Sequence, residues 1–302
     1  MQQPLTFDIK RYAINDGPGI RVCIFFKGCP LNCRWCHNPE SIAPQAQKLF
    51  TASKCIGCGE CVNICPQQAC TLTASGIVTN QELCNSCGRC ADACPARATA
   101  ISGRLRSVAE LLEIIEKERP FFDQSGGGVT ISGGEPLLFP EYLCELLDAC
   151  GERQIHRCID TAGLVKTATL LEVAKRTELF LFDLKLMESA RHKLWTGVGN
   201  ELILHNLQTL AQTGTAIQIR IPLIGGVNAD AENITATAAF IAALPGRKKS
   251  VSLLPYHNIA AGKDLKLGQQ RELDGMTEPT AEQLRSAINN FARYDISASV
   301  GG

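Results

Sequence analysis

The spacing of the cysteines constrains this chain more than any other feature of its sequence. Eleven of the 16 cysteines fall into three tight groups, with two or three residues between neighbours. Thiols so close in sequence suit a shared metal better than disulfides between distant loops. The other five lie in apolar stretches and are expected to be small buried residues: Cys23, Cys70, Cys144, Cys150 and Cys158.

Charge and hydropathy narrow the class of partner. The 302 residues carry 30 basic and 30 acidic side chains, which argues against nucleic acid or a membrane surface as partner. No apolar run approaches the roughly 20 residues of a membrane span, and residues 1–12 show no signal peptide. A soluble cytoplasmic protein is expected.

Cysteine density divides the chain. Residues 50–102 hold nine cysteines and lack a long apolar period, so we expect an inserted domain there. Residues 1–49 and 103–302 alternate short β-rich runs with amphipathic helical patterns, which predicts βα units around a parallel sheet.

The predicted elements favour a partial (β/α)6 barrel, with a doubly wound sheet as the alternative. The expected strands are Arg21–Phe26, Val129–Ser132, His156–Asp160, Leu179–Asp183, Ile217–Pro222 and Ser250–Pro255. The expected helices are Val108–Lys117, Pro140–Cys150, Thr167–Lys175, Glu201–Thr213, Ala231–Ala243 and Thr280–Phe291. Thr280 and Gln283 resemble a capping box at the start of the last helix.

Distinctive polar groups follow five of these strands. Functional residues in such folds gather where strands end and βα loops begin, so these groups should share one rim. They are Cys29, Cys33 and Cys36, then Gly133-Gly134-Glu135-Pro136, Asp160-Thr161, Asp183-Leu184-Lys185 and His257.

The first cysteine group has the spacing C-x3-C-x2-C. Cubane iron–sulfur clusters usually take four thiolates, so Cys29, Cys33 and Cys36 would leave one iron open to a small ligand. The alternative is a structural zinc site that His37 completes.

Around these cysteines the sequence resembles the glycyl-radical-enzyme activating enzymes of the radical SAM (S-adenosylmethionine) superfamily. The resemblance rests on Asp16-Gly17-Pro18-Gly19-Ile20-Arg21, Phe25-Phe26-Lys27-Gly28-Cys29, Trp35-Cys36-His37-Asn38-Pro39-Glu40, Gly133-Gly134-Glu135-Pro136, Asp160-Thr161-Ala162-Gly163, Asp183-Leu184-Lys185 and Leu254-Pro255-Tyr256-His257. It covers nearly the whole chain.

The resemblance implies an oxidoreductase whose open iron chelates the methionine part of SAM. Reductive cleavage would give methionine and a 5′-deoxyadenosyl radical, which would take hydrogen from a glycine of a partner enzyme. Gly133, Gly134 and Glu135 would present backbone groups to the methionine ammonium, and Trp35 and His37 would flank the adenine. Packing alone is the alternative for His37.

Further roles follow from position within the resemblance. Asp160 and Thr161 would serve the ribose or a monovalent cation, unless Asp160 only caps a helix. Lys185 would pair with the SAM carboxylate and Asp183 would orient it or hold a cation; an internal salt bridge is the alternative. His257 would reach the ligand, and Asp16 would touch the incoming glycine loop, unless it only forms an Asx turn. Arg220 is a weaker candidate for the same cavity.

Two further cysteine runs repeat C-x2-C-x2-C-x3-C-P, the pattern of bacterial two-cluster ferredoxins. In that pattern the fourth cysteine of each run ligates the other cluster. The first predicted set is Cys55, Cys58, Cys61 and Cys94, and the second is Cys84, Cys87, Cys90 and Cys65. Three [4Fe–4S] clusters are therefore expected, with a zinc ribbon as the alternative for the two inserted ones.

The inserted clusters would relay electrons from a flavodoxin or ferredoxin, or only scaffold the partner. Two other functions are weighed: a radical SAM enzyme that acts on a small molecule or is a maturase with auxiliary clusters, and an electron-transfer subunit. The second leaves the three-cysteine group and Gly133-Gly134-Glu135-Pro136 without a purpose.

Overall fold

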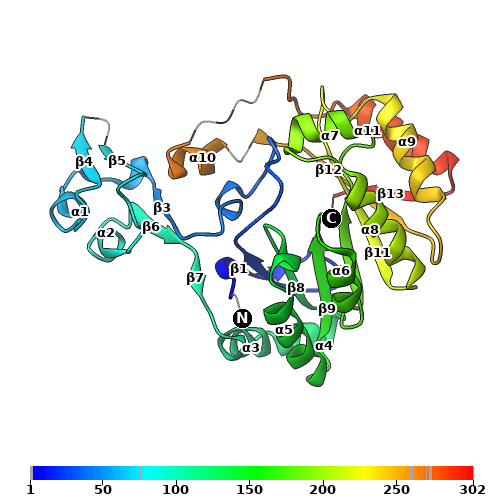
Figure 1. Ribbon diagram of the computed structural model, residues 1–302, viewed down its shortest axis with the longest axis horizontal. Coiled ribbons are helices and arrows are strands. Elements are labelled where there is room, and N and C mark those ends of the chain that lie inside the picture. The colour runs from blue at the N-terminus through cyan, green and yellow to red at the C-terminus, as the bar shows by residue number, and fades with distance from the viewer. Residues whose placement is uncertain (1–2, 75, 259–260, 270, 272–273, 302) are drawn as a thin grey trace.

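A nine-stranded sheet forms the centre of the computed structural model, which describes residues 3–74, 76–258, 261–269, 271 and 274–301 (Figure 1). Seven neighbouring strands are parallel and lie in the order β2-β8-β9-β10-β11-β12-β13. Their bounds are Arg21–Phe26, Gly128–Gly133, His156–Thr161, Leu179–Asp183, Ala216–Leu223, Ser250–Pro255 and Ser297–Val300.

All six predicted strands are present, within two residues at each end. Three further strands extend the sheet: β13 at one edge, and β1 (Leu5–Ala13) with β7 (Arg104–Leu105) at the other. β1 pairs antiparallel with both β2 and β7. The parallel run thus holds seven strands where the sequence predicts six.

The strand order decides between the two predicted architectures. From β8 to β13 each strand lies beside the next one along the chain, and β2 lies beside β8. A doubly wound sheet reverses this order at a switch point, and the described sheet advances in one direction. Right-handed crossovers in one direction place the helices on one face, so the carboxyl ends of the parallel strands share one rim.

The predicted helices form with small differences at their ends. They are α3 (Val108–Glu116), α5 (Pro140–Glu152), α6 (Thr167–Ala174), α8 (Glu201–Gln212), α9 (Ala231–Ala242) and α11 (Ala281–Arg293). Thr280 and Gln283 form the predicted capping box. The structure adds α4 (Arg119–Ser125), α7 (Ser189–Thr196) and α10 (Ala261–Leu267).

The main core lies between the sheet and these helices. Ile24, Ile131, Phe180 and Phe182 are fully buried strand residues, and Leu143 is a fully buried residue of α5. Strands β2 and β8 are buried on both faces, as expected for strands inside a parallel sheet. In the part of the chain that the structure describes, no helix is long and apolar enough to cross a membrane.

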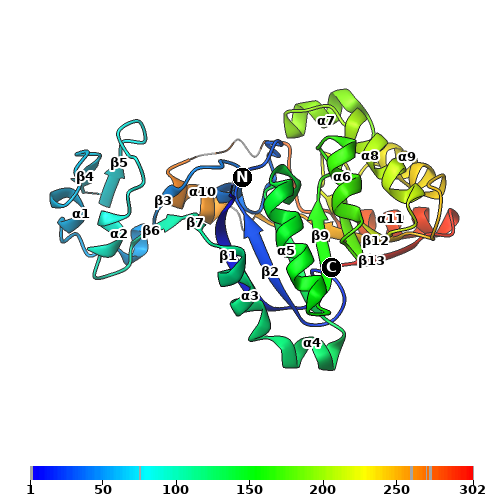
Figure 2. The same ribbon diagram turned by 60° about the horizontal axis from the view of Figure 1, so that its bottom comes forward.

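The cysteine-rich segment, residues 50–102, lies at one end of the molecule in Figures 1 and 2. It contains the single-turn helices α1 (Glu60–Asn63) and α2 (Arg89–Asp92) and the hairpin of β4 (Cys70–Thr73) with β5 (Gly76–Thr79). Its last strand, β6 (Thr99–Ser102), pairs with β3 (Gln47–Phe50), which leads into the segment. Its small core contains Cys61, Cys70 and Cys90 together with Ile77.

Candidate active site

A cavity of about 260 Å³ opens at the rim where the parallel strands end. Most of the predicted site residues line it: Asp16, Cys29, Cys33, Trp35, Cys36, His37, Gly133, Gly134, Asp160, Thr161, Asp183 and Lys185. Arg220 also lines it. Glu135 lies fully buried behind the wall, and His257 is absent from the lining.

The loop with the first cysteine group is fixed to its surroundings through its backbone. Cys29 N–H donates to Ile42 O (3.1 Å), and Cys36 N–H donates to Cys33 O (3.0 Å). Arg271, which is distant in sequence, also holds this loop: it donates to Cys36 O at 2.8 Å and to Cys33 O at 3.4 Å. An arginine 235 residues away has no local signal in the sequence, and sequence reasoning missed it.

The three thiols are poor acids unless a cation accompanies them. Burial raises the pKa of Cys33 to about 12, and it also raises the pKa values of Cys29 and Cys36. Iron would supply the positive charge that turns such thiols into thiolates. Among the described residues, no three His, Cys, Asp or Glu side chains surround a single-ion position. The three cysteines instead line a cavity, which suits a group larger than one ion.

Two glycines allow β8 to pass close to the cysteine loop. Gly133 has φ 122°, a conformation that side chains rarely adopt. A Cβ on Gly134 would come within 2.1 Å of Gly28 O. Both glycines also line the cavity, so this part of its wall is backbone.

Glu135 joins three segments of the rim from behind. Its carboxylate accepts hydrogen bonds from the Thr161 hydroxyl (2.7 Å) and Ala162 N–H (3.0 Å), and its own N–H donates to Gly28 O (2.7 Å). Burial raises the pKa of Glu135 to about 7. Its side chain organises the strand ends rather than facing the cavity.

Lys185 and Asp183 form an ion pair on the cavity wall. Lys185 Nζ lies 2.8 Å from Asp183 Oδ2, and the lysine side chain is 7% exposed. Burial opposes its charge, but Asp183 and the thiols of Cys33 and Cys29 raise its pKa. The internal salt bridge exists, and both members still line the cavity.

Beside this ion pair, carboxylates gather around one guanidinium, because Arg220 of β11 pairs with Asp183 of β10. Arg220 Nη1 lies 3.5 Å from Asp16 Oδ1 and 3.6 Å from Asp160 Oδ1. The Ser132 hydroxyl donates to Asp160 Oδ2 at 2.7 Å, and burial raises the pKa of Asp160. Cys23 is fully buried, as expected, and its thiol also donates to Asp16 Oδ2 at 3.3 Å. Arg220 Nε and Nη1 are buried without a hydrogen-bond partner among the described residues, which leaves donor capacity toward the cavity.

Aromatic rings form the wall beside the third cysteine. Trp35 is buried, and the His37 ring stacks on Tyr256 at 6.2 Å between centroids. The sequence predicts that His257 reaches the ligand, whereas its side chain is 52% exposed and its Nδ1 lies 3.3 Å from Glu278. Tyr256 lines the cavity in its place.

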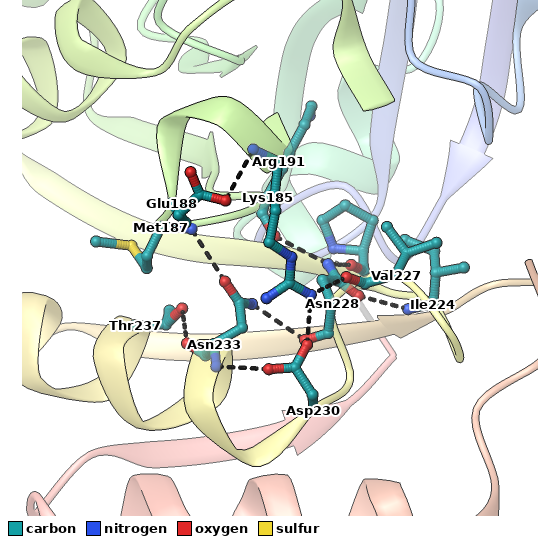
Figure 3. A network of polar contacts seen from close by, with 11 residues as sticks. Lys185, Met187, Glu188, Arg191, Ile224, Val227, Asn228, Asp230, Asn233 and Thr237 are labelled. Carbon is teal, nitrogen blue, oxygen red and sulfur yellow. Dashed lines mark hydrogen bonds and ion pairs between the residues drawn. The ribbon is translucent and has the colours of Figure 1, made fainter. Parts of the chain in front are cut away.

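Buried asparagines fix the loops that follow β10 and β11 (Figure 3). Asn228 Nδ2 donates to Lys185 O (2.9 Å) and Pro222 O (2.6 Å), while its Oδ1 accepts from Ile224 N–H (2.8 Å). Asn233 Oδ1 accepts from Met187 N–H at 3.0 Å. This network holds the backbone that carries Lys185, and sequence reasoning did not identify it.

The cysteine-rich segment contains two smaller cavities, each lined by cysteines of both runs. Cys55, Cys58, Cys61 and Cys94 line one, and Cys65, Cys84, Cys87 and Cys90 line the other, together with Cys70. The two runs also match in detail, since Ala69 N–H donates to Cys65 Sγ (3.3 Å) and Ala98 N–H donates to Cys94 Sγ (3.2 Å). These sets agree with the crossed arrangement that the ferredoxin pattern predicts.

Comparison with protein families gives one matching model, described as the radical SAM superfamily, over residues 23–238. The choline trimethylamine-lyase activating enzyme of Oleidesulfovibrio alaskensis is 40% identical over 99% of this chain and 98% of its own length. The trans-4-hydroxy-L-proline dehydratase activating enzyme of Clostridioides difficile is 42% identical over 99% of both chains. The benzylsuccinate synthase activating enzyme of Thauera aromatica is 36% identical over 100% of this chain and 94% of its own length.

Among solved structures, a domain of pyruvate-formate lyase-activating enzyme from Bacteroides vulgatus is similar, with a TM-score of 0.51 and 42% identity. The alignment covers 58% of this chain and 99% of that domain. SuiB from Streptococcus suis, at 14% identity and a TM-score of 0.53, shares the fold.

Proposed function

We propose roles for individual residues in binding the cluster, SAM and the partner, from the premise that the chain belongs to the radical SAM superfamily and, within it, to the activating enzymes of glycyl radical enzymes. Its cofactors are a [4Fe–4S] cluster and SAM. When bound, the cluster supplies the electron that cleaves SAM into methionine and the 5′-deoxyadenosyl radical that abstracts hydrogen from the partner's glycine. The observation that carries the residue assignment is the rim cavity lined by three cysteines, a lysine and two glycines.

Cys29, Cys33 and Cys36 hold the catalytic cluster in this proposal. The backbone at Gly133 and Gly134 accepts the methionine ammonium of SAM, because these residues leave the chain exposed to the cavity. Lys185 pairs with the SAM carboxylate, and its raised pKa keeps it charged for that contact.

Other residues of the same cavity lining serve the nucleoside end of SAM. Trp35 and His37 flank the adenine with their rings. Asp160, Thr161 and Asp183 serve the ribose or a monovalent cation, for which hydroxyl and carboxylate oxygens are suitable ligands. Asp16, paired to Arg220 at the cavity, meets the glycine loop of the partner.

The cysteine-rich segment is a ferredoxin-like insertion in a partial β/α barrel formed by residues 1–49 and 103–302. Its two auxiliary [4Fe–4S] clusters use the cysteine sets of the two smaller cavities. They pass electrons from a flavodoxin or ferredoxin toward the catalytic cluster. Free thiols and oxygen-sensitive clusters fit a reducing cytoplasm.

The first experiment measures SAM cleavage by the reduced, iron-loaded protein under anaerobic conditions. We expect 5′-deoxyadenosine from the wild type, and a glycine radical signal when a matching glycyl radical enzyme is present. Cys33→Ala should abolish both. Cys144→Ala, a half-buried cysteine of α5, is the matched control and should retain them. Wild-type cleavage by Cys33→Ala would overturn the site.

A second experiment tests the relay. Cys58→Ala and Cys87→Ala each remove a ligand from one auxiliary set while leaving the catalytic loop intact. Reduction of the catalytic cluster by flavodoxin or ferredoxin should slow in both variants. An unchanged reduction rate would contradict the relay and leave the segment only a scaffolding role for the partner.

A further inference from the structure

A lysine of the strand that leads into the cysteine-rich segment lies buried against that segment. Lys48 of β3 is 3% exposed, and its ammonium donates to Cys70 Sγ at 3.0 Å and to Thr79 Oγ1 at 2.9 Å. Cys70 and Thr79 face each other across the β4–β5 hairpin, so the hairpin register brings both acceptors to the lysine. Cys70, expected to be an apolar core residue, therefore accepts a hydrogen bond from a buried ammonium group.

The partners of this ammonium are a thiol and a hydroxyl rather than a carboxylate. A buried cation is strongly unfavourable unless negative charge lies nearby. Burial on its own would lower the pKa of Lys48, yet Cys70, Cys90 and Cys61 together raise it. Cys61 belongs to the first auxiliary set and Cys90 to the second, so thiols of both sets raise the pKa of Lys48.

Thiolate-ligated clusters would provide the missing negative charge. A [4Fe–4S] core with four thiolates carries a net negative charge that grows by one when the cluster accepts an electron. A fixed positive charge in a poorly solvated position favours the more negative state, and hence reduction.

We propose that Lys48 is a positioning residue that holds a permanent positive charge between the two auxiliary clusters and raises their reduction potentials. The proposal rests on the auxiliary clusters of the proposed function. Each reduction adds one electron to a cluster, and the ammonium keeps its proton throughout. The lysine thereby makes the auxiliary clusters easier to reduce by an external donor.

The test measures midpoint potentials of the iron-loaded protein by redox titration monitored with electron paramagnetic resonance. Lys48→Met and Lys48→Gln remove the charge with similar volume, and Lys48→Arg retains it. We expect the neutral variants to lower the reduction equilibrium constant of at least one auxiliary cluster tenfold or more, which is about 59 mV for one electron. Lys48→Arg should remain within about threefold of the wild type.

Lys54→Met is the surface control, because Lys54 is an exposed lysine of the same segment. Solvent screens its charge, so the potentials should stay near those of the wild type. The catalytic cluster serves as an internal reference, and its potential should not change in any of these variants.

Each outcome decides the proposal. Neutral variants with full iron content and unchanged potentials would overturn it. Iron loss from both neutral variants but not from Lys48→Arg would support it, since only the charge differs. Iron loss from all three would overturn it in favour of a packing role. Iron for a single cluster in the unmodified protein would instead refute the auxiliary clusters themselves, and the two failures are thus distinguishable.

Discussion

Single residues of the rim divide into those that the sequence identifies and those that only the fold supplies. Cys29, Cys33 and Cys36 are visible as a motif because neighbouring ligands must be close in the chain. Arg271 and Lys48 carry no such spacing, since their partners come from other segments. Motif reasoning therefore finds groups that act within one loop and misses isolated cations.

Glu135 gives a prediction about pH. Its pKa rises from 4.5 to about 7 on burial, so folding favours its protonated form. The stability that this provides is complete below pH 4.5 and is lost as the pH rises through 7. Relative to Glu135→Gln, the metal-free wild type should lose on the order of 2 kcal/mol of unfolding free energy between pH 5 and 8. Denaturant titration measures this difference, and parallel pH profiles of the two proteins would contradict it.

Arg271 gives a prediction about cluster retention. Its two hydrogen bonds to the carbonyls of Cys33 and Cys36 brace the loop, and bonds from a charged donor contribute roughly 1.5–3 kcal/mol each. Arg271→Met should therefore lose iron from the catalytic site roughly tenfold faster in the presence of a chelator. Arg285→Met changes an exposed arginine of α11 and should match the wild type. Equal rates of iron loss in the two variants would show that Arg271 does not brace the loop.

At the scale of elements, the parallel strands were predictable and the edge strands were not. Buried runs such as Arg21–Phe26 and Leu179–Asp183 are apolar on both faces and bounded by polar residues. β1 contains charged residues and exposes much of one face, and β13 has only four residues, so neither carries a clear apolar pattern. Pairing within the finished sheet, rather than local preference, makes them strands.

The loops after β10 and β11 depend on Asn228. Replacing it with alanine leaves the buried carbonyls of Lys185 and Pro222 without their donor. Asn228→Ala should lower the unfolding free energy by roughly 3 kcal/mol and raise the SAM concentration needed for half-maximal cleavage. Asn290→Ala, which removes an exposed hydrogen bond to Thr235, should change stability by less than about 0.5 kcal/mol. Denaturation curves and SAM titrations measure both, and an unaffected Asn228→Ala would exclude the network as a support.

The whole molecule combines two regions with different sources of stability. The sheet and its helices bury a large continuous apolar core, whereas the core of the cysteine-rich segment consists largely of cysteines. Small domains with so little apolar core usually need a metal or a disulfide to remain folded. The parallel sheet could be predicted from the alternation of β-rich and helical runs, but the position of the cysteine-rich segment relative to the rim depends on packing that no local pattern reports.

Removing iron should unfold the cysteine-rich segment and leave the central sheet folded. We expect the metal-free protein to be cut by protease within residues 50–102, while the central sheet retains its far-ultraviolet circular dichroism. The iron-loaded protein is the control and should resist cleavage in that segment. Equal protection with and without iron would show that the segment folds without its clusters.

The pairing of β3 with β6 has a consequence for how the cysteine-rich segment could be gained or lost in evolution. These strands lead into and out of the cysteine-rich segment, and Gln47 lies opposite Ser102. The two ends of the segment are therefore neighbours, since Phe50 lies opposite Thr99, while β2 pairs with β8 in the main sheet without them. A stretch whose ends meet can be acquired or discarded in one genetic event without breaking the ancestral sheet.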